Sequence, residues 1–249
     1  MKRISLIVPC LNEEEAIPAF KQEIDRVFKE CLEGYAPELI FVDDGSTDRS
    51  LEMIKKMAEH SPEVKFISFS RNFGKEAAIY AGLEAATGDY AAVMDVDLQD
   101  PPSLLPDMLK AIEKEGYDCA GTRRVTRQGE PLLRSFFARA FYKTIHQISD
   151  TRIVDGARDY KLMTRPVLEA LLSLKEYNRF SKGLYEWVGF RTKWFEYENV
   201  ERVAGETKWS FFKLFLYSIE GIVAFSTAPL ALASIMAVSY THLRAHETP

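Results

Sequence analysis

Residues 90–102 read Tyr-Ala-Ala-Val-Met-Asp-Val-Asp-Leu-Gln-Asp-Pro-Pro and join a predicted strand to a predicted helix. The apolar run that opens this stretch is typical of a buried strand, and Asp95 and Asp97 follow where the run ends. Asp100 and the two prolines after it form a helix start signal, so we expect a helix over 103–114. In open α/β sheets, ligands bind at the carboxyl ends of the strands. The carboxylates are therefore expected at a ligand-binding edge of a sheet.

The same stretch supplies only oxygen ligands, from the carboxylates of Asp95 and Asp97 and the side-chain amide of Gln99. Such ligands suit Mg²⁺ or Mn²⁺ that is held partly by protein and partly by the phosphates of a substrate. The alternative interpretation is that the two aspartates only cap a helix and expose a turn to solvent. For an isolated Asp-x-Asp, that interpretation would be the better one. Because a predicted strand precedes them and a helix start follows, we favour the metal site.

Composition narrows the classes of function. Of the 249 residues, 47% are hydrophobic, which is enough for a sizeable core. The net charge of −5 and the lack of a nucleic-acid-binding motif argue against nucleic acid as a partner. The three cysteines form no Cys-x-x-Cys pair, so no structural zinc is expected. Residues 123–143 carry six Lys or Arg against Glu130 alone, which indicates a phosphate or anionic membrane surface or, equally well, a solvated helix face.

Strand and helix patterns alternate through the first half of the chain. Strands are predicted at 4–9, 39–42, 64–69, 90–94 and 118–121. Helices are predicted from Pro18 to Cys31 and at 48–58, 76–86 and 103–114. This alternation predicts an α/β fold with a doubly wound, mainly parallel sheet. The chain has neither a Gly-x-Gly-x-x-Gly nor a Walker loop, which disfavours dinucleotide oxidoreductases and P-loop enzymes.

Four motifs occur in register along this alternation. They are Ile-Val-Pro-Cys-Leu-Asn-Glu-Glu at 7–14, Val-Asp-Asp-Gly-Ser-Thr-Asp at 42–48, Arg-Asn-Phe-Gly-Lys at 71–75 and Asp-Val-Asp-Leu-Gln-Asp-Pro-Pro at 95–102. With these motifs, residues 1–230 resemble the polyprenyl-phosphate branch of the family 2 glycosyltransferases. The resemblance implies a GT-A-type catalytic domain and a metal-dependent, inverting hexosyltransferase. Its donor would be a nucleotide sugar such as UDP-glucose, and its acceptor a polyprenyl phosphate at the cytoplasmic face of a membrane.

Two other functions remain open at this point. One is a relative in the same family that acts on a saccharide or lipid hydroxyl. The other is a non-catalytic, nucleotide-sugar-binding membrane adaptor, which would have no need of a metal at the leaving group. A homo-oligomer is also compatible with the resemblance.

The resemblance also assigns roles to residues. The positions that match donor binding are Pro9, Leu11, Glu13, Asp43, Asp44, Asp95, Val96, Asp97, Arg202 and Lys208. The metal positions are Asp97, Gln99 and Asp95, and the loss of the Asp97 carboxylate is expected to lower activity severely. Arg123 and Arg134 are expected to bind the acceptor phosphate. Residues 178–183 and 187–190 follow the pattern of the branch and are expected near the acceptor.

Two further positions have competing interpretations. Asp159 falls on the candidate catalytic base, although Arg158 and Tyr160 stand where the family commonly has Gly and Phe. The alternative is that Asp159 forms a structural ion pair with Arg158 or Arg165. Lys75 is either a phosphate contact or a surface lysine at the start of a helix.

Membrane attachment is expected in two segments. Residues 131–148 have a wide apolar stripe beside a basic face, typical either of a core-facing helix or of one lying in a membrane interface, and the resemblance favours the interface. Residues 221–240 lack charged side chains, although Pro229 interrupts them. We therefore expect a catalytic domain over 1–209, a juxtamembrane helix and the start of a transmembrane helix over 210–238, and a non-native tail over 239–249.

Overall fold

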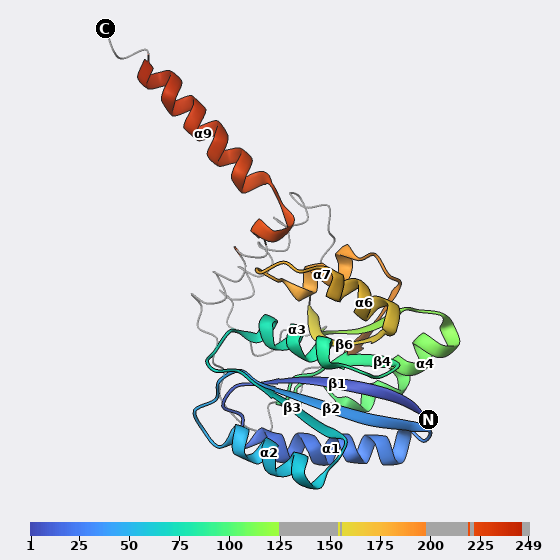
Figure 1. Ribbon diagram of the computed structural model, residues 1–249. Helices are drawn as coiled ribbons and strands as arrows, with labels where there is room; N and C mark the ends of the chain where they lie inside the picture. Colours follow the sequence, from blue (N-terminus) through green and yellow to red (C-terminus); the bar gives the residue numbers. More distant parts are fainter. Residues whose placement is uncertain (125–153, 155, 198–218, 220–221, 246–249) are drawn as a thin grey trace. The chain divides into compact units, whose positions relative to one another are not determined.

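The computed structural model describes residues 1–124, 154, 156–197, 219 and 222–245 (Figure 1). The chain divides into two compact units, one of Met1–Gly129 with Val154–Lys208 and the other of Glu130–Ile153 with Trp209–Pro249. All the described strands belong to the first unit, whereas helix α9 (Ala228–Ala245) belongs to the second.

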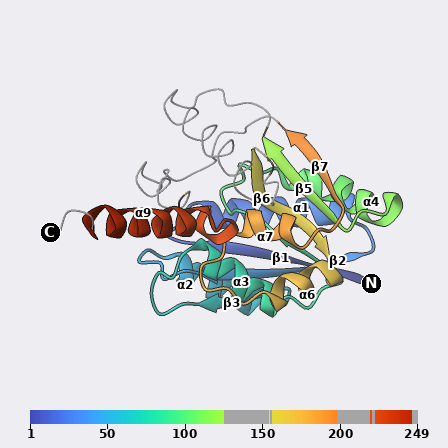
Figure 2. The ribbon, with the colours of Figure 1, turned by 90° about the horizontal axis from the view of Figure 1, so that it is seen from above.

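The strands of the described residues form one seven-stranded sheet in the order β3-β2-β1-β4-β6-β5-β7, and Figure 2 shows β6, β5 and β7 side by side. Neighbouring strands pair in parallel except β6, which is antiparallel to both β4 and β5. The strands are β1 (Lys2–Cys10), β2 (Tyr35–Asp43), β3 (Val64–Ser68), β4 (Tyr90–Val93), β5 (Cys119–Arg124), β6 (Ala157–Thr164) and β7 (Thr192–Tyr197). This arrangement confirms the α/β fold with a mainly parallel sheet.

Helices cover both faces of the sheet. Figure 1 shows α1 and α2 on one face and α3, α6 and α7 on the other. The helices of the first unit are α1 (Ala16–Cys31), α2 (Ser50–His60), α3 (Lys75–Ala85), α4 (Leu105–Glu115), α6 (Arg165–Ser173) and α7 (Ser181–Trp187), with the 3₁₀ turn η1 (Pro102–Leu104) before α4. On the α3 face, a Cβ atom at Gly82 would lie 2.3 Å from Ile7 Cγ2, so α3 approaches β1 closely because position 82 has no side chain.

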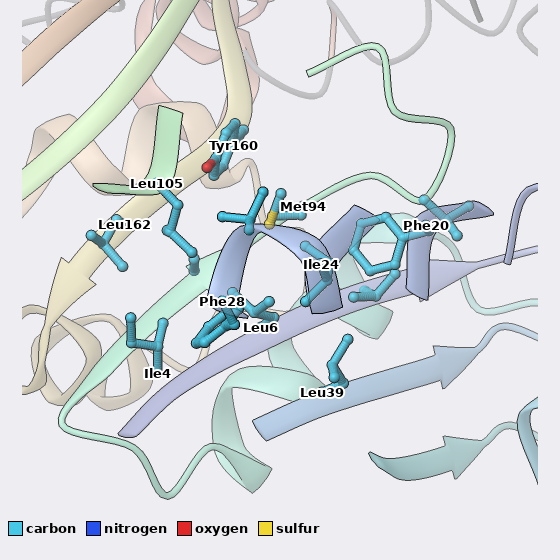
Figure 3. Packing of buried hydrophobic residues seen from close by; sticks show 14 of the residues in the cluster. Ile4, Leu6, Phe20, Ile24, Phe28, Leu39, Met94, Leu105, Tyr160 and Leu162 are labelled. Carbon is cyan, nitrogen blue, oxygen red and sulfur yellow. The ribbon is translucent and has the colours of Figure 1, made fainter. Parts of the chain in front are cut away.

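The main core lies between the sheet and α1 with α4. Figure 3 shows Phe20 and Ile24 of α1, Leu6 of β1 and Leu105 of α4 among its side chains, all of them fully buried. The ring of Phe20 meets that of Phe41 edge to face, with centroids 6.2 Å apart. Each such buried side chain contributes about 1.5–3 kcal/mol to folding, and the core fixes the strand ends that carry the polar loops.

The predicted strands at 4–9, 39–42, 64–69, 90–94 and 118–121 are confirmed as β1–β5, with shifted ends. The helix predicted over 48–58 begins instead at Ser50, because Asp48 accepts hydrogen bonds from the backbone N–H groups of Ser50 and Glu14 and stays in the loop. The helix predicted from residue 103 starts as η1 and becomes α helical at Leu105.

Several expectations concern the second unit or residues outside the described ranges. Helix α9 runs through residues 239–245, across the boundary expected for the tail. In the part of the chain that the structure describes, no helix combines the length and apolar character needed to cross a bilayer. The expected interface helix over 131–148 lies outside the described residues, as do Arg134, Arg202 and Lys208.

Candidate active site

The candidate site is built from the loops that follow β1, β2, β3 and β4. These four strands are mutually parallel, so their carboxyl ends meet at one edge of the sheet. Pro9 and Leu11 lie at the end of β1, Asp43 ends β2, and Asp95 follows β4. The residues predicted to bind the donor in this half of the chain are therefore brought to the same edge.

The loops after β1 and β2 are joined by hydrogen bonds. The backbone N–H of Asn12 donates to Ser46 Oγ at 2.9 Å, and that of Thr47 donates to Asn12 Oδ1 at 2.7 Å. Glu13 N–H donates to Ser50 Oγ at 2.8 Å. Asn12 has a φ of 52°, a left-handed conformation that Asn tolerates better than most residues. The loops that carry Leu11, Glu13 and Asp43 are thus fixed against each other.

Asp44 supports the loop that precedes α3. Its carboxylate is buried and accepts hydrogen bonds from the backbone N–H groups of Phe73, at 2.7 Å, and Gly74, at 3.0 Å. Gly74 has a φ of 98°, which favours glycine. Burial raises the pKa of Asp44, although these hydrogen bonds work in the opposite direction. The carboxylate predicted to contact the donor therefore fixes the backbone just before Lys75.

Lys75, the first residue of α3, lies between two carboxylates of the site. Its Nζ is 2.6 Å from Asp95 Oδ1 and also donates a hydrogen bond to Asp159 Oδ2. Lys182 Nζ of α7 is 3.8 Å from the other oxygen of Asp159. The interpretation of Lys75 as an ordinary surface lysine is thus wrong, since two residues predicted for the site hold its ammonium.

These lysines determine the charge state of Asp159. Burial alone would raise the pKa of the carboxyl, but the charges of Lys75 and Lys182 outweigh it and hold the pKa below its usual range. The alternative ion pair with Arg158 or Arg165 is wrong. Arg158 Nε instead lies 3.0 Å from Asp100 Oδ1, and Arg165 Nε lies 3.1 Å from Glu169 Oε1.

The loop that carries the predicted metal ligands is held at both ends. At one end Asp95 pairs with Lys75, and at the other Asp100 is buried and pairs with Arg158. Tyr197 Oη, at the end of β7, also hydrogen-bonds to Asp100. Because side chains alternate along a strand, Arg158 and Asp159 extend from opposite faces of β6.

Asp97, Leu98 and Gln99 lie between these two anchors. Leu98 has a φ of 56°, and Gln99 N–H donates to Asp97 Oδ1 at 3.2 Å. Asp97 is buried, and Val96 packs into the core behind it. Among the described residues, no three His, Cys, Asp or Glu side chains form a ready-made metal cluster. Carboxylate and amide oxygens nevertheless fit Mg²⁺ or Mn²⁺, because one or two protein carboxylates suffice when substrate phosphates and water supply the other ligands.

Arg123, predicted to bind the acceptor phosphate, is the residue before the last of β5; it lies beside Glu196 of β7 and forms an ion pair with it. Sequence reasoning did not find Lys182, Glu76 or Tyr197 as parts of the site. Lys182 lies within the segment 178–183 that was expected near the acceptor, which was the available signal. Glu76 accepts hydrogen bonds from Ser181 of α7, and Tyr197 of β7 hydrogen-bonds to Asp100, so both contacts depend on where the chain after β6 places α7 and β7.

Comparison with known proteins identifies a family and several relatives. Residues 5–172 match the family described as Glycosyl transferase family 2. The Bacillus subtilis (strain 168) protein CsbB is 44% identical over 229 residues, covering 92% of this chain and 68% of CsbB. The prophage bactoprenol glucosyl transferase homolog of Escherichia coli (strain K12) is 42% identical over 230 residues, covering 92% of this chain and 74% of the relative.

Among solved structures, glucosyl-3-phosphoglycerate synthase from Mycobacterium tuberculosis, in complex with Mn²⁺ and UDP-glucose, superimposes with a TM-score of 0.55. It is 20% identical, and the match covers 89% of this chain and 77% of that one. This likeness concerns the fold and agrees with the GT-A-type architecture. With a family match over 168 residues (5–172) and relatives above 40% identity, the chain belongs to glycosyltransferase family 2.

Proposed function

We propose that this chain transfers glucose, with inversion, from UDP-glucose to a polyprenyl phosphate at the cytoplasmic face of a membrane. The observation that carries the proposal is the joining of Lys75, Asp95 and Asp159 at the edge where the donor loops meet. The name of the E. coli relative, a bactoprenol glucosyl transferase homolog, supports the lipid acceptor and the sugar.

The donor would bind across the carboxyl ends of β1, β2 and β4. The fixed loops present Leu11, Glu13 and Asp43 to the nucleoside, and the 95–100 loop presents Asp97 and Gln99 to the diphosphate. Asp97, Gln99 and Asp95 would hold Mg²⁺ or Mn²⁺, which supplies positive charge to the departing nucleoside diphosphate. The anchors at Asp95 and at the buried Asp100 keep this loop in position, so little reorganisation is needed when the donor binds.

In the reaction, an acceptor oxygen forms a bond to C1 of the sugar while the bond from C1 to the donor diphosphate breaks. A phosphate monoester has a second pKa of about 6, so most of it is dianionic at pH 7 and needs no base. A hydroxyl acceptor would need a base to remove its proton. Asp159, with its pKa held low by two lysines, would be a weak base, which favours the phosphate acceptor over the hydroxyl.

A donor panel tests this function. The full chain in detergent is incubated with a polyprenyl phosphate and labelled UDP-glucose, UDP-N-acetylglucosamine or GDP-mannose, and the lipid fraction is analysed. We expect a glucosylated lipid phosphate from UDP-glucose. A product from another donor would correct the sugar, whereas no lipid product from any donor would contradict the proposed function.

A further inference from the structure

Lys75 and Lys182 form a pair of ammonium groups at the carboxylate of Asp159. Lys75 belongs to α3 and Lys182 to α7, yet both approach the same carboxylate, one at each oxygen. The two side chains remain 31% and 23% exposed, so a ligand can reach them. We call these residues the lysine pair.

The backbone beside each lysine of the pair is fixed by hydrogen bonds between Glu76 and Ser181. Glu76, next to Lys75, accepts hydrogen bonds from the backbone N–H of Ser181 at 3.1 and 3.2 Å and from the Ser181 hydroxyl. Ser181 is the residue before Lys182 and is itself buried. The Glu76–Ser181 contact therefore joins the first turns of α3 and α7 and sets the spacing of the two lysines.

The ammonium groups have donors to spare. An ammonium group carries three N–H donors, and Lys75 directs two of them at Asp95 and Asp159. Lys182 contacts Asp159 at 3.8 Å, a distance that leaves its hydrogen bonds available to a closer acceptor. The Glu76–Ser181 contact holds these two ammonium groups near each other, so together they can donate hydrogen bonds to an anion with several acceptor oxygens, such as a phosphate monoester.

We propose that the lysine pair binds the phosphate of the acceptor. This inference rests on the proposed function and adds a place for the acceptor headgroup. Lys75 joins the two halves of the site, because the same ammonium contacts Asp95 of the donor side and Asp159. A phosphate held by the lysine pair lies next to the loop that presents Asp97, where the sugar is transferred. Arg123, which the resemblance assigns to the acceptor phosphate, forms an exposed ion pair with Glu196 of β7.

The test is equilibrium binding of geranyl phosphate, a soluble short-chain probe, to the full chain in detergent by calorimetry. UDP with Mn²⁺ is titrated separately. We expect Lys182→Gln to lower the affinity for geranyl phosphate about tenfold, because one charge-assisted hydrogen bond is lost. The affinity for UDP should change less than about twofold. Lys182→Arg should retain most of the affinity. Lys75→Gln should also lower the affinity for geranyl phosphate about tenfold.

Lys193→Gln is the matched control, because Lys193 is 33% exposed and pairs with Glu115 at 2.6 Å on the edge strand β7. It should bind both ligands as the wild type does. If Lys182→Gln binds geranyl phosphate with wild-type affinity, the lysine pair is not the acceptor subsite. The same holds if its affinity for UDP falls as much as its affinity for geranyl phosphate.

Transfer by the wild type separates this result from the proposed function. If the wild type glucosylates geranyl phosphate and Lys182→Gln keeps the same KM for it, the function stands and the subsite is wrong. If the wild type does not bind geranyl phosphate but glucosylates a polyprenyl phosphate, the function stands and the subsite is wrong. If it glucosylates neither lipid phosphate, both proposals fail.

Discussion

Arg158 Nε of β6 lies 3.0 Å from Oδ1 of Asp100, which is only 1% exposed. Through this contact, the strand that carries Asp159 holds the loop that carries Asp97 and Gln99. Arg158 is also a departure from the usual family pattern, where a glycine is common. The family residue could not make this ion pair, so the loop in this chain has an additional anchor.

Removal of this anchor should destabilise the protein. Arg158→Met would leave the buried carboxylate of Asp100 without its ionic partner, and breaking a buried pair in this way costs about 3–5 kcal/mol. We expect a loss in that range in the free energy of unfolding, measured by urea denaturation. Arg165→Met is the control, since Arg165 and Glu169 form an exposed pair that contributes about 1 kcal/mol or less. Equal losses in the two variants would contradict the role of Arg158.

Asp97 should be needed for metal-dependent turnover. Asp97→Asn would remove a carboxylate from the predicted metal ligands and lower activity by about a hundredfold or more, because charge stabilisation of several kcal/mol is lost. The measurement is transfer from labelled UDP-glucose with added Mg²⁺ or Mn²⁺. Asp107→Asn, at an exposed position in the first turn of α4, should leave the rate unchanged. Full turnover of the wild type in excess EDTA would contradict the claim that transfer depends on a divalent metal.

Asp159→Asn should lower the rate of transfer without lowering the affinity for the donor nucleotide. Asp159 holds the ammonium groups of Lys75 and Lys182, so loss of its charge should misplace both. We expect kcat/KM for the lipid phosphate to fall about tenfold or more, while UDP affinity stays near the wild-type value. Asp89→Asn is the control, because Asp89 accepts a hydrogen bond from Arg3 N–H beside the first residues of β1. Unchanged acceptor kinetics in Asp159→Asn would count against this role.

Glu38 should make stability depend on acid pH. Its buried carboxylate accepts hydrogen bonds from Lys65 at 2.6 Å, from Thr87 and from Ser5. Burial would raise the pKa of Glu38, but these hydrogen bonds, from Lys65 above all, lower it from 4.5 to about 2. The folded protein therefore releases this proton more readily than the unfolded chain. The stabilisation is complete above the unfolded pKa and is lost as the pH falls from there towards about 2.

The pH effect is read from urea denaturation at a series of acid pH values. Allowing for solvent screening of Lys65, we expect the wild type to lose about 2 kcal/mol more than Glu38→Gln over this range. Glu52→Gln removes a carboxylate from an exposed pair with Lys56 and should keep the wild-type pH dependence. An identical slope in wild type and Glu38→Gln would show that Glu38 is not responsible.

The sequence could predict those parts of the fold and site that depend on local pattern. The run before Asp95, the prolines after Asp100 and the alternation of strands with helices are local signals, and β1–β5 lie where they were expected. Asp159 was found only through the resemblance. The partners of Asp159 could not be predicted, because they depend on β6 entering the sheet antiparallel between β4 and β5.

Lys75 illustrates the same limit. Residues 71–75 were recognisable as a motif, but spacing along the chain does not say which loop the first residue of a helix will face. The close approach of α3 to β1 at Gly82, and the Asp44 contact with Gly74, place the Lys75 ammonium between Asp95 and Asp159. These are contacts between residues 20 or more positions apart, which a single sequence does not reveal.

The central claim is that the acceptor is a lipid phosphate, and it can be tested by offering two acceptors that differ only in that group. Polyprenyl phosphate and the matching polyprenol are presented to the full chain in detergent with labelled UDP-glucose, and the label in each lipid is followed over time. We predict transfer to the phosphate at least about a hundredfold faster, because the alcohol lacks the efficient base that it would need. Glucosylation of the polyprenol at a comparable rate would contradict the account.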